Sequence, residues 1–240
     1  MDKMMYKSEA DKLRIQLIPK LYCTIFVCAK KESDKTNAIF KILKECTGKK
    51  THLYIISSTA FNDDTWIYII DYFENKGIDM TISTSLSEAG IPNKELEDKA
   101  RKDMEDRKNE EEEPKQVLML FYEQEEKSER KPKKIAPEYI FVFDDMSSML
   151  RNKDIGTLIK YHRHFKTKII LSSQYPNDLA PESRKQTNIF LLFAGHSEDQ
   201  LLELSKNMDL SIPFELFVQL YHNATSKPYS FLSVIPSIRN

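Results

Sequence analysis

Residues 21–46 have the sequence LYCTIFVCAKKESDKTNAIFKILKEC, and this stretch decides the fold. Residues 21–28 are rich in β-branched and aromatic side chains, which is typical of a buried strand. Residues 36–46 carry apolar side chains at positions 39, 40, 42 and 43, the spacing of an amphipathic helix. A polar turn, residues 29–35, lies between them. A strand that leads through a short turn into a helix is the building unit of α/β sheets.

The same alternation of strand and helix continues along the chain. Apolar, β-branched stretches predict further strands at residues 52–57, 78–83, 138–143, 167–172, 188–193 and 229–234. Helical spacing predicts helices at residues 63–75, 154–165, 197–207 and 212–223. We expect Gly48 and Gly77 to end the helices before them and Ser197 to cap the helix that follows it. This pattern predicts an α/β fold, a mostly parallel sheet with helices on both faces.

The length of 240 residues suits one domain, residues 1–240, with an insertion at about residues 93–134. Of these 42 residues 26 are charged, and acid–base pairs four residues apart, such as Glu95 and Lys99, favour an exposed helix. We predict a solvated helical segment with a charged loop. The alternative is a contact surface for DNA or for a partner subunit.

Cysteine usage and hydropathy bear on the compartment. The chain has an odd number of cysteines, Cys23, Cys28 and Cys46, and no CxxC pair occurs among them. This favours a reducing compartment without a disulfide framework or structural zinc. The longest apolar runs, such as residues 118–122, are too short to span a bilayer, and the charged first twelve residues hold no signal core. We expect a soluble intracellular protein. The net charge of -1 neither indicates nucleic-acid binding nor excludes a local basic surface.

The turn between the first strand and helix is the first candidate for chemistry. Residues 29–36, AKKESDKT, lie where backbone N–H groups and the helix dipole converge on a phosphate. A phosphate loop has the pattern GxxxxGK[ST], of which Lys35 and Thr36 are present. Lys35 would reach the β- and γ-phosphates of ATP, and the Thr36 hydroxyl would bind Mg²⁺. Ala29 and Asp34 replace the two glycines, so a polar turn that caps the helix is the alternative.

Two later strands end in polar residues suited to nucleotide hydrolysis. Residues 140–145, IFVFDD, place Asp144 and Asp145 after four apolar residues. The first acid would hold Mg²⁺ and the second would polarise the attacking water. Residues 167–174 end in Gln174, whose amide would sense the γ-phosphate or orient water. Open α/β sheets bind ligands at the carboxyl ends of their strands. The alternatives are acids that begin a loop and an amide that belongs to a turn.

Two arginines precede predicted strands. Arg163 lies ahead of the strand at 167–172, and Arg184 lies ahead of the strand at 188–193. Either would serve as an arginine finger, in its own subunit or across an interface. A surface salt bridge or a contact with a DNA phosphate is an equal alternative. The flanking His162 and His164 lack metal-ligand spacing.

Five segments follow one another along the chain: xxxxDKT in the first turn, IFVFDDM, YHRHFKTKIILSSQ, LAPESRKQTNIFLLF and YHNATSKPYSFLSV. In this order they resemble the poxvirus-type genome-packaging ATPases of large DNA viruses, virophages and Polinton-like elements, a branch of the FtsK/HerA superfamily. The resemblance covers about residues 21–235, with the charged insertion matching poorly.

The resemblance implies a RecA-like P-loop core and ATP-driven translocation of double-stranded DNA into a capsid. It also implies a homo-oligomeric ring, the cofactors ATP and Mg²⁺, capsid components as partners, and a place in the host cytoplasm or nucleus or in the virion. The matching residues are Lys35 and Thr36 for phosphate and Mg²⁺, Asp144 for the Walker B acid, Asp145 for the catalytic acid, Gln174 for the sensor amide and Arg184 for the finger.

Three residues depart from the family pattern, because Ala29, Glu32 and Asp34 stand where the family has glycines. A packaging ATPase requires a phosphate-loop backbone at residues 33–36, where Ser33 would also contact the nucleotide. The alternative is a catalytically impaired relative that serves as a structural or interaction subunit. The Asp34 carboxylate favours it, because like charges about 4 Å apart repel by roughly 4 kcal/mol at intermediate dielectric. A nucleotide-dependent switch or kinase would need an acceptor-binding feature that the sequence does not show.

Overall fold

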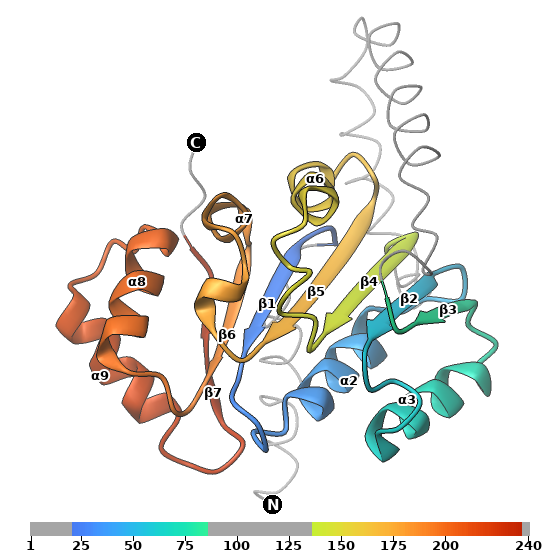
Figure 1. The fold of residues 1–240 in the computed structure, drawn as a ribbon, viewed down its shortest axis with the longest axis horizontal. Helices are drawn as coiled ribbons and strands as arrows, with labels where there is room; N and C mark the ends of the chain where they lie inside the picture. The colour runs from blue at the N-terminus through green and yellow to red at the C-terminus, as the bar shows by residue number, and fades with distance from the viewer. Residues whose placement is uncertain (1–20, 86–135, 237–240) are drawn as a thin grey trace, which may run out of the picture. The chain divides into compact units, whose positions relative to one another are not determined.

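Seven strands form one sheet in the order β3-β2-β4-β5-β1-β6-β7 (Figure 1) within the described part of the chain. The structure is a computed structural model, and it describes residues 21–85 and 136–236. All neighbouring strands pair in parallel except β6 and β7, which are antiparallel. The strands are β1 Thr24–Cys28, β2 His52–Ser57, β3 Met80–Ser83, β4 Tyr139–Asp144, β5 Thr167–Ser173, β6 Ile189–Phe193 and β7 Phe231–Val234. The predicted α/β fold with a mostly parallel sheet is confirmed.

The central strands are buried over their whole length. Every residue of β1 and β5 is buried, which explains why these segments are nearly continuous apolar runs in the sequence. Phe26 on β1 lies opposite Leu171 of β5 and Phe190 of β6. Strand β1 is therefore held on both sides, and the turn that follows it emerges from the most buried part of the sheet.

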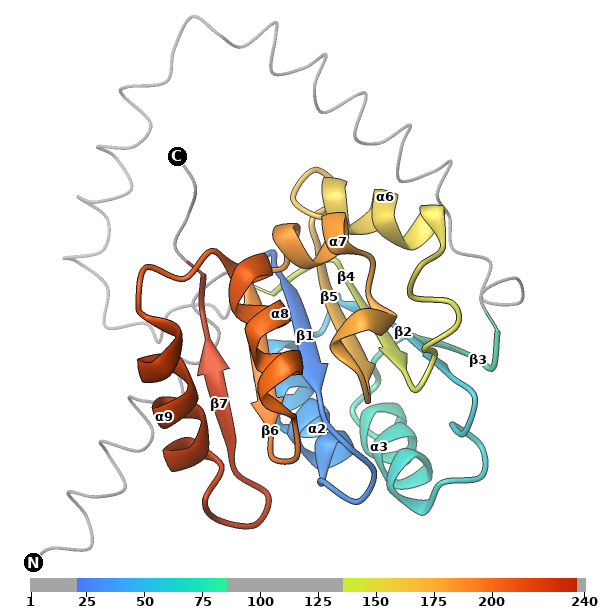
Figure 2. The ribbon, with the colours of Figure 1, turned by 60° about the vertical axis from the view of Figure 1, so that its left-hand side comes forward.

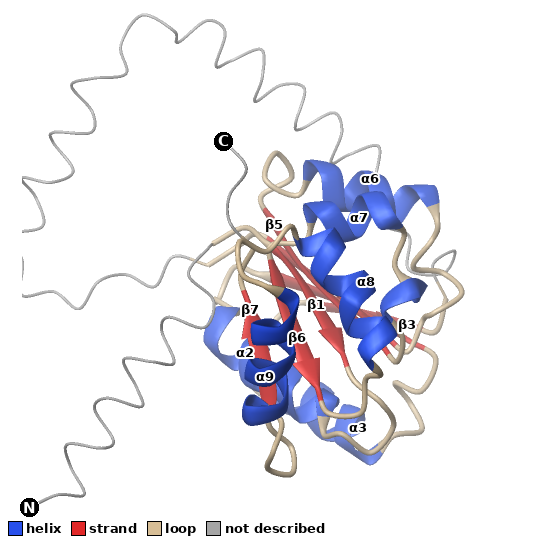
Figure 3. Cartoon of the chain, turned by 90° about the vertical axis from the view of Figure 1, so that its left-hand side faces the viewer, coloured by secondary structure: helices blue, strands red, loops and turns tan. Residues whose placement is uncertain are grey.

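Helices cover both faces of the sheet. The connections from β1 to β2 and from β2 to β3 run toward one edge, whereas those from β4 to β5 and from β5 to β6 run toward the other. Parallel crossovers are right-handed, so opposite directions place their helices on opposite faces. Accordingly α2 Lys35–Cys46 and α3 Asp64–Glu74 share one hydrophobic cluster with Ile25 and Val27. On the other face lie α6 Lys153–Tyr161 and α7 Pro181–Gln186 (Figure 3).

Two more helices lie beside the antiparallel edge. They are α8 Glu198–Met208 and α9 Phe214–Ala224, next to β6 and β7 (Figure 2). The predicted cap at Ser197 is confirmed: Gln200 N donates to Ser197 Oγ at 3.4 Å, and Ser197 N donates to Gln200 Oε1 at 3.1 Å. The rings of Phe193 and Phe231 contact each other across the β6–β7 pair in a tilted arrangement, with centroids 5.1 Å apart.

Of the two glycines expected to end helices, one does so and one does not. Gly77 has φ +65° and follows α3 as predicted. The prediction for Gly48 is wrong, because α2 ends at Cys46 and its cap is Thr47, in an extended conformation. A side chain on Gly48 would bring its Cβ within 2.5 Å of Ala136 Cβ. Gly48 is therefore needed for a close approach of two segments, not for a left-handed turn.

Two short helices between β5 and β6 lie outside the predicted set, namely η1 Pro176–Asp178 and α7. The charged insertion at residues 93–134 lies outside the described residues, so its predicted form and the single-domain organisation remain predictions. Within residues 21–85 and 136–236, none of the helices is long and apolar enough to cross a membrane.

Candidate functional site

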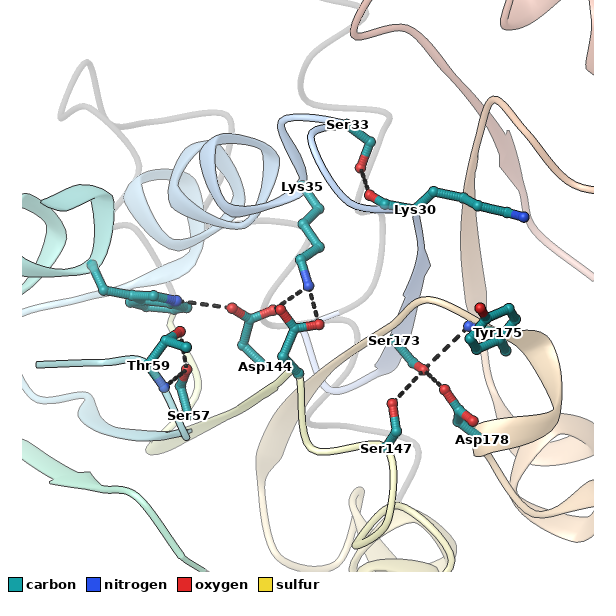
Figure 4. Close-up of polar contacts among 12 residues, drawn as sticks. Lys30, Ser33, Lys35, Ser57, Thr59, Asp144, Ser147, Ser173, Tyr175 and Asp178 are labelled. Atoms are coloured by element: carbon teal, nitrogen blue, oxygen red, sulfur yellow. Dashed lines mark hydrogen bonds and ion pairs between the residues drawn. The ribbon is translucent and has the colours of Figure 1, made fainter. Parts of the chain in front are cut away.

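A cavity of about 520 Å³ opens at the edge of the sheet where the parallel strands end. The turn after β1 and the first turn of α2 form one wall, and the acids at the end of β4 form another (Figure 4). Its lining residues are Lys31, Glu32, Ser33, Asp34, Lys35, Thr36, Asn37, Asp63, Thr65, Asp144, Asp145 and Tyr229. The predicted turn and the predicted acid pair therefore meet, as expected for the carboxyl edge of an open sheet.

The turn after β1 is left-handed at two non-glycine residues. Glu32 has φ 62° and Asp34 has φ 65°, a region that costs an ordinary side chain roughly 1–2 kcal/mol. Asp34 lies at the N-cap of α2, and its carboxylate accepts a hydrogen bond from the Asn37 side chain. Ser33 Oγ donates to Lys30 O at 2.6 Å. The turn thus keeps left-handed backbone where the resembled family has glycine, although the glycines are gone.

Lys35 lies between this turn and the acids of β4. Its side chain is 11% exposed, and its Nζ lies 3.5 Å from Asp144 Oδ1 and forms an ion pair with Asp145. Asp144 is 1% exposed, whereas the Asp145 side chain is 32% exposed. Lys35 thus joins the turn after β1 to the two acids at the end of β4 on one cavity.

The two oxygens of Asp144 have different surroundings. Its Oδ2 accepts a hydrogen bond of 2.8 Å from Nε1 of Trp66, which lies on α3. Its Oδ1 is buried without a hydrogen-bond partner among the described residues. A buried carboxylate oxygen without a hydrogen bond, on a residue that lines a cavity, is suited to receive a cation or a metal-bound water, and Lys35 Nζ already lies 3.5 Å from it.

The charges that line the cavity are predominantly negative. Five lining residues carry carboxylates and two carry amines. Of the carboxylates, Asp63 also caps α3, because its Oδ1 accepts from Thr65 N at 2.8 Å and Trp66 N at 3.4 Å. A bound polyanion would therefore need cations to offset this field.

Gln174 follows β5 at the same edge but does not line the cavity. It is half-buried, and the loop around it is tied to its neighbours through Ser173. Ser173 Oγ donates to Asp178 and lies 3.3 Å from Ser147 Oγ, while Tyr175 N donates to Ser173 Oγ at 3.4 Å (Figure 4). The Gln174 loop is thus linked to the segment that follows the two acids.

Arg184 is buried on α7, away from the cavity lining. Its Nη1 donates to Pro176 O at 3.1 Å and to Asn177 Oδ1 at 2.7 Å, and its Nη2 pairs with Glu203 Oε1 at 3.0 Å. These contacts hold the loop that follows Gln174 against α8. A finger role for Arg184 remains a prediction, and it would require the guanidinium to leave these partners or to be reached there by another subunit.

The contacts of Arg184 predict a loss of stability on its removal. We expect Arg184→Ala to lower the free energy of unfolding by about 2 kcal/mol, less than for a fully buried pair because the Glu203 side chain is 38% exposed. This corresponds to about 4–8 °C in the melting temperature. Thermal unfolding would check it, with the exposed neighbour Lys185→Ala as a control expected to melt within 2 °C or so of the wild type. An unchanged melting temperature for Arg184→Ala would contradict the bracing role.

Arg163, the other finger candidate, is exposed and precedes β5, so it lies toward the opposite edge of the sheet.

The cysteine next to the turn is not a nucleophile, because burial, together with the Asp178 charge, raises the pKa of the Cys28 thiol far above its ordinary value. Burial also lowers the pKa of His196, whose Nε2 lies 3.2 Å from Cys28 O. These two residues support the start of the turn.

Five residues of the site were not predicted from the sequence: Asn37, Asp63, Thr65, Trp66 and Tyr229. Asp63 carried a usable signal, since an Asp before an apolar helix is a common N-cap. Tyr229 has φ 62° and is 68% exposed at the mouth of the cavity, just before β7. Trp66 reaches Asp144 across 78 positions of sequence, and no local pattern indicates that contact.

Comparison with known proteins adds one finding about the fold. No protein-family model and no curated protein sequence matches the chain. Among solved structures, the genome-packaging NTPase B204 of Sulfolobus turreted icosahedral virus 2 in complex with sulfate matches with a TM-score of 0.52 and 16% identity, over 90% of this chain and 92% of that one. The chain has the fold of a viral genome-packaging NTPase.

The same fold match recurs in two other structures of this kind. The B204 complex with ATP-gammaS has a TM-score of 0.51 at 14% identity, with coverage of 90% of this chain and 93% of that one. The DNA-packaging ATPase B204 from Sulfolobus turreted icosahedral virus has a TM-score of 0.50 at 15% identity, with coverage of 89% and 92%. These neighbours are consistent with the resemblance of the sequence to packaging ATPases. They do not show that the chain belongs to the poxvirus-type branch.

Proposed function

We propose that the protein is an ATPase that couples ATP hydrolysis to the translocation of double-stranded viral DNA into a capsid. One observation carries the ATPase part: Lys35 contacts both Asp144 and Asp145 beside a left-handed turn that opens α2, all on one cavity. Lysine, Walker B acids and a phosphate turn at one sheet edge are the parts that nucleoside triphosphate hydrolysis requires.

The residues of the cavity fit a magnesium–nucleotide complex. Backbone N–H groups of residues 33–36 and the dipole of α2 would face the phosphates, with Ser33 at the turn and the ammonium of Lys35 near the β- and γ-phosphates. Asp144 and Thr36 both line the cavity, and the Asp144 Oδ1, which accepts no hydrogen bond among the described residues, and the Thr36 hydroxyl are hard oxygen ligands of the kind that Mg²⁺ prefers. When bound, Mg²⁺ would neutralise the charge that develops on the phosphates.

Asp145 and Gln174 take the water-directing roles in this proposal. Asp145 is the more exposed acid of the pair and lines the cavity, so it can accept the proton of an attacking water. Gln174 stands on the loop after β5, where an amide would orient that water or report the γ-phosphate. The link from Ser173 to Ser147 would carry a movement of the Gln174 loop to the segment that follows Asp145.

The packaging role rests on the fold match together with the segments quoted from the sequence. The matched neighbours are genome-packaging NTPases. We propose by analogy double-stranded DNA, capsid components and further copies of this chain in a ring as partners, with Arg184 as the finger candidate between copies. The proposed place of action is the virion or its assembly site in the host cytoplasm or nucleus.

The deciding experiment measures ATP binding and turnover by the purified protein. We expect calorimetry to detect ATP binding that strengthens with Mg²⁺, and hydrolysis to rise when double-stranded DNA is added. Binding without DNA stimulation would retain the ATPase and remove the translocation role. No binding by folded protein at millimolar ATP would overturn the ATPase proposal.

A catalytically impaired relative that acts as a structural subunit is the second candidate, and a specific observation favours it. Carboxylates of Glu32 and Asp34 line the cavity on the phosphate turn itself. Restoring glycine at both positions separates the candidates, because it removes two negative charges and the left-handed strain without touching Lys35 or the β4 acids.

For the ATPase, we expect Glu32→Gly/Asp34→Gly to strengthen Mg²⁺–ATP binding about tenfold, equivalent to roughly 1.4 kcal/mol. The matched control is Ala29→Gly, which we expect to change the affinity less than about twofold. Unlike Glu32 and Asp34, Ala29 does not have a positive φ, so glycine relieves no strain there and removes no charge. Calorimetric titration checks both. Binding that occurs only in the glycine variant would identify the natural chain as the impaired relative.

A further inference from the structure

We propose that Trp66 is a positioning residue that fixes the orientation of the Asp144 carboxylate, so that one chosen oxygen faces the metal of a bound Mg²⁺–ATP. The inference rests on the proposed ATP-binding function and extends it to a residue that no phosphate-loop pattern contains. It is carried by the contact between the Trp66 indole and Asp144 and by the unequal surroundings of the two carboxylate oxygens.

The indole is held in place by its own helix. Trp66 is the third residue of α3 and is 0% exposed within the cluster that joins α2 and α3 to the sheet. Asp63 caps this helix and accepts hydrogen bonds from Thr65 N and Trp66 N. Cap and core together fix where the indole N–H points, and it points at Asp144 Oδ2 from 2.8 Å.

The consequence for Asp144 is a choice between its oxygens. With Oδ2 accepting from Trp66, rotation about the Cβ–Cγ bond would break a buried hydrogen bond. The remaining Oδ1 accepts no hydrogen bond among the described residues and lies 3.5 Å from Lys35 Nζ, and Asp144 is one of the residues that line the cavity. Carboxylates that bind metals are commonly oriented in this way by a hydrogen bond to the second oxygen.

A purely structural role for Trp66 makes a different prediction. A buried indole N–H needs an acceptor, and Asp144 would then merely supply one. In that case the loss of the N–H lowers stability and leaves the metal dependence of ATP binding unchanged. The dependence of ATP binding on Mg²⁺ therefore distinguishes a positioning role of Trp66 from a purely structural one.

The experiment compares Trp66→Phe with the wild type by calorimetric ATP titration over a series of Mg²⁺ concentrations. We expect the Mg²⁺ concentration at half-maximal enhancement of binding to rise about tenfold, equivalent to roughly 1.4 kcal/mol, and the metal-free ATP affinity to change less than about twofold. The matched control is Phe73→Leu, a 3% exposed aromatic residue on the same helix that contacts the rings of Phe40 and Tyr72. It should keep the wild-type Mg²⁺ dependence.

A spectroscopic measurement on the unaltered protein protects the test against a variant that misfolds. The chain has one tryptophan, so its emission reports Trp66 alone. We expect Mg²⁺ added to the ATP-bound protein to change this emission, and Asp144→Asn to abolish the change. An emission unaffected by Mg²⁺, or wild-type Mg²⁺ dependence in folded Trp66→Phe, would overturn the inference. A wild type that binds no Mg²⁺–ATP at all would instead overturn the proposed function beneath it.

Discussion

Lys35→Ala is expected to weaken Mg²⁺–ATP binding about 100-fold and to abolish DNA-stimulated hydrolysis. A charge-assisted hydrogen bond is worth roughly 1.5–3 kcal/mol, and the upper part of that range corresponds to this factor. The Lys35 ammonium contacts both Asp144 and Asp145 on the cavity, and in the proposed function it also contacts the phosphates of ATP. Calorimetry and a phosphate-release assay would measure the two effects.

Removal of Lys35 has a second effect, on folding stability. Asp144 is only 1% exposed, and without Lys35 its buried carboxylate loses the cation that pairs with it. We therefore expect Lys35→Ala to be less stable than the wild type. The double variant Lys35→Ala/Asp144→Asn should recover stability but not ATP binding. Recovery of both would show that the lysine acts through folding alone.

The matched control for this prediction is Lys41→Ala. Lys41 is an exposed lysine on the same helix, and its substitution by alanine removes the same charge from the protein. We expect it to bind Mg²⁺–ATP as the wild type does, within about twofold, because screening weakens charges that lie far from the cavity. An equal loss in both variants would assign the effect to net charge rather than to the site.

The sheet was predictable from the sequence because its central strands are buried on both faces. Residues 52–57 were predicted and observed with the same bounds, and β1 began three residues later than predicted, at Thr24. The helix α7 was not predicted, since its six residues, PESRKQ, lack apolar periodicity. It is held by tertiary contacts of Arg184 with Asn177 and Glu203, which no local pattern contains.

The site was predictable in part for the same reason. Asp144 ends the buried strand β4 and Gln174 directly follows the buried strand β5, so their place at one edge follows from strand direction. The left-handed backbone at Asp34 was not predictable, because the loss of glycine argues against it. It persists because Asp tolerates this region better than most residues and because Asn37 holds its carboxylate. A search for the glycines of the phosphate-loop pattern alone would therefore miss the left-handed backbone of this turn.

The second large effect is expected for Asp145→Asn, which should lower the rate of hydrolysis about 1,000-fold while ATP binding is retained. General base catalysis contributes roughly 10²–10⁴ to a rate, and an amide cannot accept the proton. The substitution also frees Lys35 from one of its two carboxylates, so the affinity for ATP should rise, by about threefold, rather than fall. Single-turnover hydrolysis and calorimetry would separate the two changes.

Asp63→Asn distinguishes a catalytic acid from a general effect of cavity charge. Asp63 lines the same cavity, but its carboxylate caps α3, and Asn serves as well as Asp at an N-cap. Both variants remove one negative charge from the cavity, so a charge effect alone would change their turnover equally. We expect only Asp145→Asn to lose hydrolysis, because of these two acids only Asp145 is paired with Lys35, the lysine proposed to contact the phosphates.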